Sequence, residues 1–142
     1  MKAVLDTNII VSATLYAQSL PAYVLALGIN RYYTICFSDA IMEEYRDVLS
    51  RGKFNFSATA VDRLISDIAR HGVKVNPAKA SSHTALDPLD QKFLDCASAA
   101  MADYLVTGNK RHFPRQTEKT AVVSPAEFAA SLSEILHKNR PA

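Results

Sequence analysis

The stretch AVLDTNIIV (residues 3–11) decides how the fold begins, because it places a carboxylate between two apolar runs. Residues 3–5 are typical of a short buried strand, and Asp6 follows directly at its carboxyl end, ahead of the apolar residues 9–11. Burying a carboxylate there costs free energy unless a cation or hydrogen-bond donors meet it. Two interpretations are open: Asp6 caps a helix that follows, or it holds a metal ion at the edge of a sheet.

Segments typical of strands and helices alternate along the rest of the chain. The expected strands are residues 3–5, 32–37, 73–75, 104–106 and 121–123. The expected helices are residues 21–27 (with Gly28 as their stop), 38–50, 58–70, 87–101 and 124–137. This alternation with short connections predicts an α/β domain with a mostly parallel sheet, in which ligand sites collect at the carboxyl ends of the strands.

Length and composition favour one globular domain over residues 1–142. The chain is 49% apolar and 21% charged with 4 Gly and 6 Pro, which argues against a disordered or collagen-like protein. No apolar run approaches the ~20 residues of a membrane helix, and no secretory signal pattern opens the chain, so we expect a cytoplasmic protein without membrane contact. Cys36 and Cys96 lack the spacing of a zinc site or a disulfide framework, which predicts two buried free thiols. The net charge of +2 is too small to identify a nucleic-acid binder by itself.

On the helix expected over residues 38–50, one acid falls beside the apolar face. Glu44 lies at the border of the apolar arc, whereas Glu43 and Asp47 lie further toward solvent. Acids at such borders are common on amphipathic helices, so Glu44 is open to a structural interpretation as well as to a functional one.

A third acid, Asp90, falls within an apolar helix face formed by Phe93, Leu94, Ala97 and Met101. Lys92 points away from this stripe and Asp95 lies nearly opposite, which places Asp95 outside any metal site that Asp90 forms. A carboxylate on an apolar face needs a positive partner, although an acid in the first turn also stabilises the positive end of a helix. Asp87, directly before Pro88, fits the N-cap position better.

Polar residues also follow the strand expected at residues 104–106. Thr107 and Asn109 come where this strand ends, in the same position relative to a strand as Asp6. The densest basic stretch of the chain lies behind them: Lys110, Arg111, His112, Arg115 and Lys119. Such a loop either increases solubility or, beside a cluster of acids, binds the phosphates of a polyanion.

Three carboxylates at one sheet edge would repel one another unless divalent cations neutralise them. Oxygen ligands without His or Cys suit Mg²⁺ or Mn²⁺, and such ions can activate a water and stabilise the charge that builds on a phosphodiester during its displacement. The sequence contains no G-x-S-x-G motif, P-loop or Ser/His/Asp order that would favour another chemistry.

Four motifs, in order, resemble the PIN-domain family: VLDTN (residues 4–8), SDAIMEEYRDVL (38–49), DPLDQKFLDCA (87–97) and ADYLVTGNKRHFP (102–114). The resemblance covers residues 1–123, and the nearest branch is the bacterial PIN proteins that are toxin components of toxin–antitoxin systems, relatives of the VapC toxins. It implies a three-layer α/β/α sandwich, with a sheet of about five strands, and an Mg²⁺- or Mn²⁺-dependent endoribonuclease.

The resemblance also implies roles for individual residues. The residues that match the family's three invariant acids, and would be catalytic metal ligands, are Asp6, Glu44 and Asp90. The residues that would support them are Thr7, Asn8 and Thr107. Asn109 stands where many PIN domains carry a fourth Asp, and because an amide adds no charge we expect a weak or water-mediated ligand there. The basic residues expected to hold RNA phosphates are Lys110, Arg111, His112 and Arg115.

The toxin branch further implies an RNA substrate, a cognate antitoxin protein and a homodimer. One alternative is a PIN fold with weak catalysis that serves as a binding or assembly module, which Asn109 favours. Another is a housekeeping RNA-processing nuclease. A third is a haloacid-dehalogenase-like phosphatase, but Asp6-Thr7-Asn8 lacks the second Asp that those enzymes carry two residues after the first.

Overall fold

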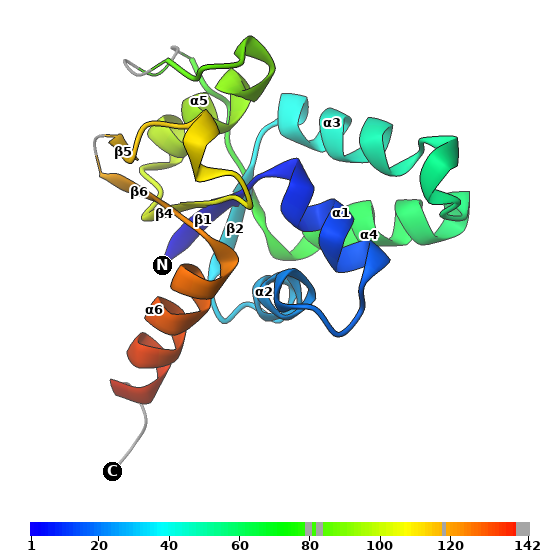
Figure 1. The fold of residues 1–142 in the computed structure, drawn as a ribbon, viewed down its shortest axis with the longest axis horizontal. Helices are drawn as coiled ribbons and strands as arrows, with labels where there is room; N and C mark the ends of the chain where they lie inside the picture. The colour runs from blue at the N-terminus through cyan, green and yellow to red at the C-terminus, as the bar shows by residue number, and fades with distance from the viewer. Residues whose placement is uncertain (79–80, 82–83, 118, 139–142) are drawn as a thin grey trace.

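Six strands form one sheet in the computed structural model of the protein, which describes residues 1–78, 81, 84–117 and 119–138 (Figure 1). The strands are β1 (Lys2–Leu5), β2 (Thr34–Phe37), β3 (Val73–Lys74), β4 (Tyr104–Val106), β5 (Gln116–Thr117) and β6 (Thr120–Val123). They lie in the order β3-β2-β1-β4-β6-β5, and every pairing is parallel except that of β5 with β6. The prediction of a mostly parallel sheet is confirmed.

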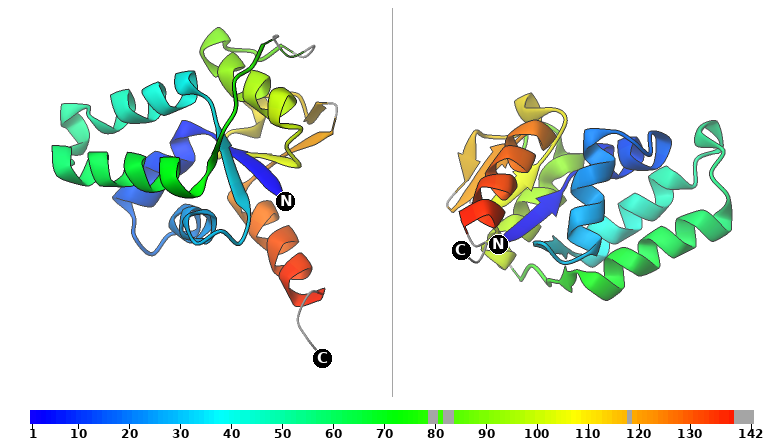
Figure 2. Two further views of the ribbon diagram at one scale, coloured as in Figure 1. Left: turned by 180° about the vertical axis from the view of Figure 1, so that it is seen from behind. Right: turned by 90° about the horizontal axis from the view of Figure 1, so that it is seen from below.

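Six α-helices flank this sheet within the described part of the chain. They are α1 (Thr7–Leu15), α2 (Leu20–Ile29), α3 (Asp39–Leu49), α4 (Ala58–His71), α5 (Gln91–Ala100) and α6 (Pro125–Lys138). Helix α5 packs against β1, β2 and β4, whereas α2 packs against β2, and α6 against β4 and β6. Because α5 lies on one side of the strands and α2 and α6 on the other, the three layers of an α/β/α sandwich are present (Figure 2). Helices α3 and α4 form an arm that projects beyond the sheet (Figure 1).

The core lies between the sheet and its helices, because the central strands carry apolar side chains on both faces. Residues 3–5 of β1 are fully buried, as are Leu105 and Val106 of β4. On the α6 side, Phe128 packs edge-on against Tyr33 and Tyr104, with ring centroids 4.8 and 5.4 Å apart. Strands that are buried on both faces form continuous apolar runs in a sequence, which is why the sequence pattern located the central strands.

Gly28 lies inside α2 rather than after it, so the prediction that it ends the helix is wrong. A Cβ atom at this position would lie 2.5 Å from Cδ1 of Ile35 and 2.8 Å from the ring of Tyr33. A side chain at this position would therefore force the Ile35 and Tyr33 side chains to move, and glycine lets α2 pack closely against them.

The segment after Asp87 starts and ends differently from the helix expected there. The Asp87 side chain accepts a hydrogen bond from the Leu89 N–H at 2.9 Å and acts as a cap, but Pro88–Asp90 (η2) is a 3₁₀ turn and α5 begins only at Gln91. Met101 adopts a left-handed conformation with φ 53° and is 65% exposed. Its expected place in the apolar stripe is therefore wrong, whereas the other three members of the stripe are buried.

The sheet contains one strand more than the five expected. Strand β5 consists of two residues paired antiparallel with β6, and two residues are too few to produce a hydrophobic pattern. Cys36 and Cys96 are buried free thiols, as predicted. No single helix among the described residues is long and apolar enough to span a membrane; α1 and α2 together have the length and composition, but they are bent by 106° at the break between them.

Candidate active site

Polar residues follow four of the strands at one edge of the sheet. Asp6 comes directly after β1, Ser38 after β2, Thr107 after β4 and Ser124 after β6. Because these strands are parallel, their carboxyl ends meet at the same edge. Ser38 and Ser124 serve structure there, since the Ser38 side chain caps α3, and the Ser124 side chain accepts a hydrogen bond from the Glu127 N–H in the predicted capping box of α6. Asp6 and Thr107 remain as candidates for chemistry.

Asp6 is held between β1 and β4, and its side chain contacts Thr107, the residue that follows β4. Its N–H donates to the carbonyl of Val106 at 2.9 Å, which continues the pairing of the two strands. The Thr107 hydroxyl donates to Oδ2 of Asp6 at 2.7 Å. Asp6 occupies the N-cap position of α1, yet its side chain makes no capping hydrogen bond, so the capping interpretation is wrong.

Burial and neighbouring acids make the ionised form of Asp6 costly. Only 7% of the residue is exposed, and burial raises the pKa of its carboxyl from 3.8 to about 6. The hydrogen bond from Thr107 lowers this pKa, whereas the carboxylates of Asp90 and Glu44 raise it. The electrostatic influence of both acids on Asp6 indicates that the three carboxylates belong to one acidic environment.

Glu44 enters this environment from α3 and is engaged through both of its carboxylate oxygens. Oε2 accepts a short hydrogen bond from the Thr7 hydroxyl, and Oε1 accepts one from Nζ of Lys92 at 2.5 Å. The neighbouring Tyr45 is fully buried and donates its hydroxyl to the carbonyl of Leu5. This bond fastens α3 to the carboxyl end of β1, which places Glu44 next to the residues that follow β1.

Asp90 reaches the site from the end of η2, immediately before α5. Its Oδ2 lies 3.4 Å from Nδ1 of His112, and its side chain is 18% exposed. Burial raises the pKa of Asp90, as do the carboxylates of Asp87 and Glu44, while His112 opposes the shift. The group that faces Asp90 is therefore a histidine of the loop after β4.

The loop after β4 is connected to the acids by a chain of polar contacts. The Gly108 N–H donates to Oδ1 of Asn8 at 3.2 Å, and the Asn109 N–H donates to the Thr107 hydroxyl at 3.0 Å. Nδ2 of Asn109 lies 3.0 Å from Nε2 of His112, in the 3₁₀ turn η3 (Lys110–His112). The side chain of Asn109 thus contacts the histidine that neighbours Asp90.

The donor set suits a hard divalent cation, although no three side chains are already gathered around one point. Carboxylate oxygens that repel one another in a buried setting are the ligands that Mg²⁺ and Mn²⁺ prefer. Among the described residues, no group of three His, Cys, Asp or Glu side chains is arranged to hold a metal ion. Glu44 and Asp90 instead face Lys92 and His112, two groups of the chain itself.

Lys92 is the site residue that sequence reasoning missed. It was expected to point away from the apolar stripe, but its side chain is only 23% exposed and forms the ion pair with Glu44. Because α5 packs against α3, a long side chain in its first turn reaches across to that helix. A lysine two positions after a candidate ligand was the signal available in the sequence.

Asp95 is engaged elsewhere, and its contacts agree with its expected place outside the acidic site. Its Oδ1 accepts hydrogen bonds from the Ser81 N–H at 2.7 Å and from Nε2 of Gln91 at 3.0 Å.

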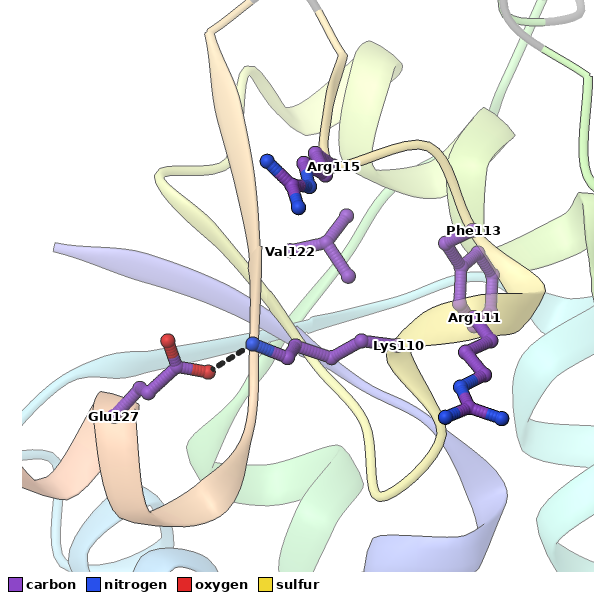
Figure 3. A pocket seen from close by; sticks show the side chains of 6 residues that line it. All are labelled: Lys110, Arg111, Phe113, Arg115, Val122 and Glu127. Carbon is purple, nitrogen blue, oxygen red and sulfur yellow. Dashed lines mark hydrogen bonds and ion pairs between the residues drawn. The ribbon is translucent and has the colours of Figure 1, made fainter.

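Three of the basic residues after β4 line a cavity of about 490 Å³ (Figure 3). Lys110 reaches across this cavity to Oε1 of Glu127 at 2.7 Å, and this contact helps to lower the pKa of Glu127 to about 2. Arg111 and Arg115 also line it, and neither is paired with an acid among the described residues. The turn η3 thus contacts Asp90 through His112 and the helix α6 through Lys110.

These features define a class: an α/β protein with one buried and two partly buried carboxylates near the carboxyl edge of a parallel sheet and a basic loop that contacts them. The family model of the PIN domain matches residues 2–111. The chain therefore belongs to the PIN domain family, whose members are generally nucleases and typically use divalent metals. No curated protein matches the chain.

Proposed function

We propose that the protein is an Mg²⁺- or Mn²⁺-dependent endoribonuclease that hydrolyses RNA phosphodiester bonds. The observation that carries this proposal is Asp6, whose pKa of about 6 reflects burial and the repulsion of Asp90 and Glu44 at the carboxyl end of β1. Carboxylates that are costly to ionise together are stabilised by a divalent cation placed among them. Membership of the PIN domain family supports nuclease chemistry over the phosphatase alternative.

The ion would be held by the three acids, with Asn109 as a weak or water-mediated ligand. Such a cation, when bound, activates a water and stabilises the charge on a phosphodiester. The chain's own residues orient the ligands: the Thr107 hydroxyl fixes one oxygen of Asp6, and the Thr7 hydroxyl fixes one oxygen of Glu44. Asn8 holds the loop that carries Thr107 through its hydrogen bond with the Gly108 N–H.

The substrate would be drawn in by the basic residues of the neighbouring loop, because a cluster of acids alone repels a polyanion. The residues that would hold RNA phosphates are Lys110, Arg111, His112 and Arg115. His112 contacts Asp90, so a phosphate held by this loop would lie close to the acids.

The biological role that fits best is that of a cytoplasmic toxin, restrained by a cognate antitoxin and assembled as a homodimer. This part of the proposal rests on the resemblance of the four motifs to the toxin branch of the family. A binding module with weak catalysis is the second candidate, and the amide of Asn109, which contacts His112 where a fourth acid could stand, favours it.

Cleavage of single-stranded and structured RNA during an Mg²⁺ or Mn²⁺ titration tests the proposed activity. Glu44→Gln and Asp90→Asn should each reduce cleavage by about 100-fold or more, because each removes a charge that the cation needs. Glu43→Gln is the matched control, since Glu43 precedes Glu44 on α3 but is exposed. Absence of metal-dependent cleavage by the wild type, or an equal loss in Glu43→Gln, would contradict the proposal.

RNA binding is tested separately by salt dependence. The double variant Lys110→Ala and Arg111→Ala should bind RNA more weakly across sequences, with a salt slope flatter by about one unit per lost phosphate contact. A variant with Lys53→Ala and Arg63→Ala, two exposed residues of the α3–α4 arm, is the control. If both double variants lose affinity equally, the loop after β4 is not the RNA-binding element.

A further inference from the structure

Both carboxylate oxygens of Glu44 are occupied by groups of the chain itself. Nζ of Lys92 lies 2.5 Å from Oε1, and the Thr7 hydroxyl donates to Oε2. The ion pair is largely shielded, since the side chains of Lys92 and Glu44 are 23% and 22% exposed. A metal ion could therefore bind this carboxylate only in exchange for one of these two partners.

The two partners are not equivalent in such an exchange. Thr7 presents a neutral hydroxyl, whereas Lys92 presents a full positive charge within contact distance of the oxygen. Two cations that share one carboxylate oxygen repel each other, so the ammonium is the partner that a divalent ion must displace. In the part of the chain that the structure describes, Lys92 is the one lysine or arginine that forms an ion pair with any of the three acids. Asp6 instead accepts a hydrogen bond from a hydroxyl, and Asp90 contacts His112.

We propose that Lys92 is a positioning residue that acts as a resident counter-ion: it holds Glu44 in the site without metal and competes with the divalent cation for that carboxylate. This inference rests on the proposed metal-dependent activity. A resident counter-ion explains why, among the described residues, the three carboxylates suit a hard cation but are not already arranged to hold one. The ion pair lets the protein fold with Glu44 close to two further carboxylates, and metal binding then carries the cost of breaking it.

Calorimetric titration of Mn²⁺ into the metal-free wild type and its variants tests this competition. Lys92→Met keeps the apolar stem and removes the charge, so Mn²⁺ should bind about five- to tenfold more tightly, as expected for the loss of a partly shielded ion pair. Lys92→Arg keeps the charge and should bind Mn²⁺ no more tightly than the wild type. Lys138→Met removes a lysine charge from an exposed pair on α6 and controls for net charge.

A double-variant cycle separates direct competition from a general electrostatic effect. In a Glu44→Gln background, Lys92→Met should change Mn²⁺ affinity by less than about twofold, because the competition runs through the carboxylate. In EDTA, Lys92→Met should also lower the thermal midpoint, and Mn²⁺ should raise that midpoint more than it does for the wild type. A Lys92 that only packs against α3 would lower the midpoint without tightening Mn²⁺ binding.

The outcomes distinguish this inference from the activity on which it rests. If the wild type binds Mn²⁺ and the folded Lys92→Met variant binds it equally or more weakly, the counter-ion role is refuted while the metal site stands. An increase that persists in the Glu44→Gln background, or that Lys138→Met or Lys92→Arg reproduces, also refutes it. If no variant and no wild-type sample binds Mn²⁺, the proposed function itself fails.

Discussion

In the absence of metal, replacement of Asp6 by Asn should make the free energy of unfolding of the protein less dependent on pH. The Thr107 hydroxyl can donate to the amide oxygen as it does to the carboxylate, so the local hydrogen bond is retained. The repulsion from Asp90 and Glu44 disappears, and so does the cost of burying a charge at a residue that is 7% exposed.

The magnitude follows from the displacement of the Asp6 pKa from 3.8 to about 6. Because the pKa is higher in the folded state, Asp6 keeps its proton between pH 3.8 and about 6 in the folded protein but loses it in the unfolded chain. The contribution of Asp6 to stability is therefore fully present below pH ~3.8 and is lost as the pH rises through about 6, with a total change of about 3 kcal/mol. Between pH 4.5 and 7.5 the expected change is about 2 kcal/mol.

Urea denaturation in EDTA, at half-unit steps from pH 4.5 to 7.5, measures this effect as a difference between Asp6→Asn and the wild type. The free energy of unfolding of Asp6→Asn relative to the wild type should rise by about 2 kcal/mol over the range. Asp62→Asn, which removes a carboxylate that is 64% exposed, is the control. Its free energy of unfolding relative to the wild type should change by less than about 1 kcal/mol over the same pH range. A difference for Asp6→Asn that stays constant with pH would refute the assigned burial and repulsion.

Three further predictions concern residues around the site. Asp95→Asn should retain cleavage where Asp90→Asn loses it, because the Asp95 carboxylate accepts hydrogen bonds outside the acidic site; equal losses in two folded variants would place Asp95 among the ligands. Tyr45→Phe should lower the free energy of unfolding by about 1–3 kcal/mol in urea titrations, since it leaves the buried carbonyl of Leu5 without its donor; an unchanged value would show that water replaces the hydroxyl. Asn109→Asp should tighten Mn²⁺ binding in calorimetry by adding a charge where the amide offers only a dipole; unchanged or weaker binding would place this side chain outside the metal site.

The fold was largely predictable because its central strands are short and buried on both faces. Runs such as residues 3–5 and 104–106 leave few alternatives to a strand in a parallel sheet, and the caps at Ser38 and Ser124 use local chemistry that a sequence displays directly. Gly28 was misjudged for a physical reason: a glycine that ends a helix and one that allows close packing against Ile35 look alike in a sequence.

The sequence identified the acids as candidates but not the groups that contact them. Asp6 and Asp90 interrupt apolar patterns, and that conflict is visible without a structure. Lys92 and His112 interrupt no pattern, and their roles depend on which helix packs against which, a tertiary property that the spacing of residues does not contain.

The partners explain why the acidic edge is compatible with a stable fold before any cation binds. Asp6 accepts a hydrogen bond from a hydroxyl, and its raised pKa favours the protonated form. Asp90 contacts an imidazole, and Glu44 forms an ion pair with an ammonium. Each of these partners stabilises one carboxylate, whereas a divalent ion can neutralise several at once. The three partners come from different elements: the end of β4, the turn η3 and the helix α5. The three acids can therefore lie at one sheet edge because each has a partner from a different part of the chain: Thr107, His112 and Lys92.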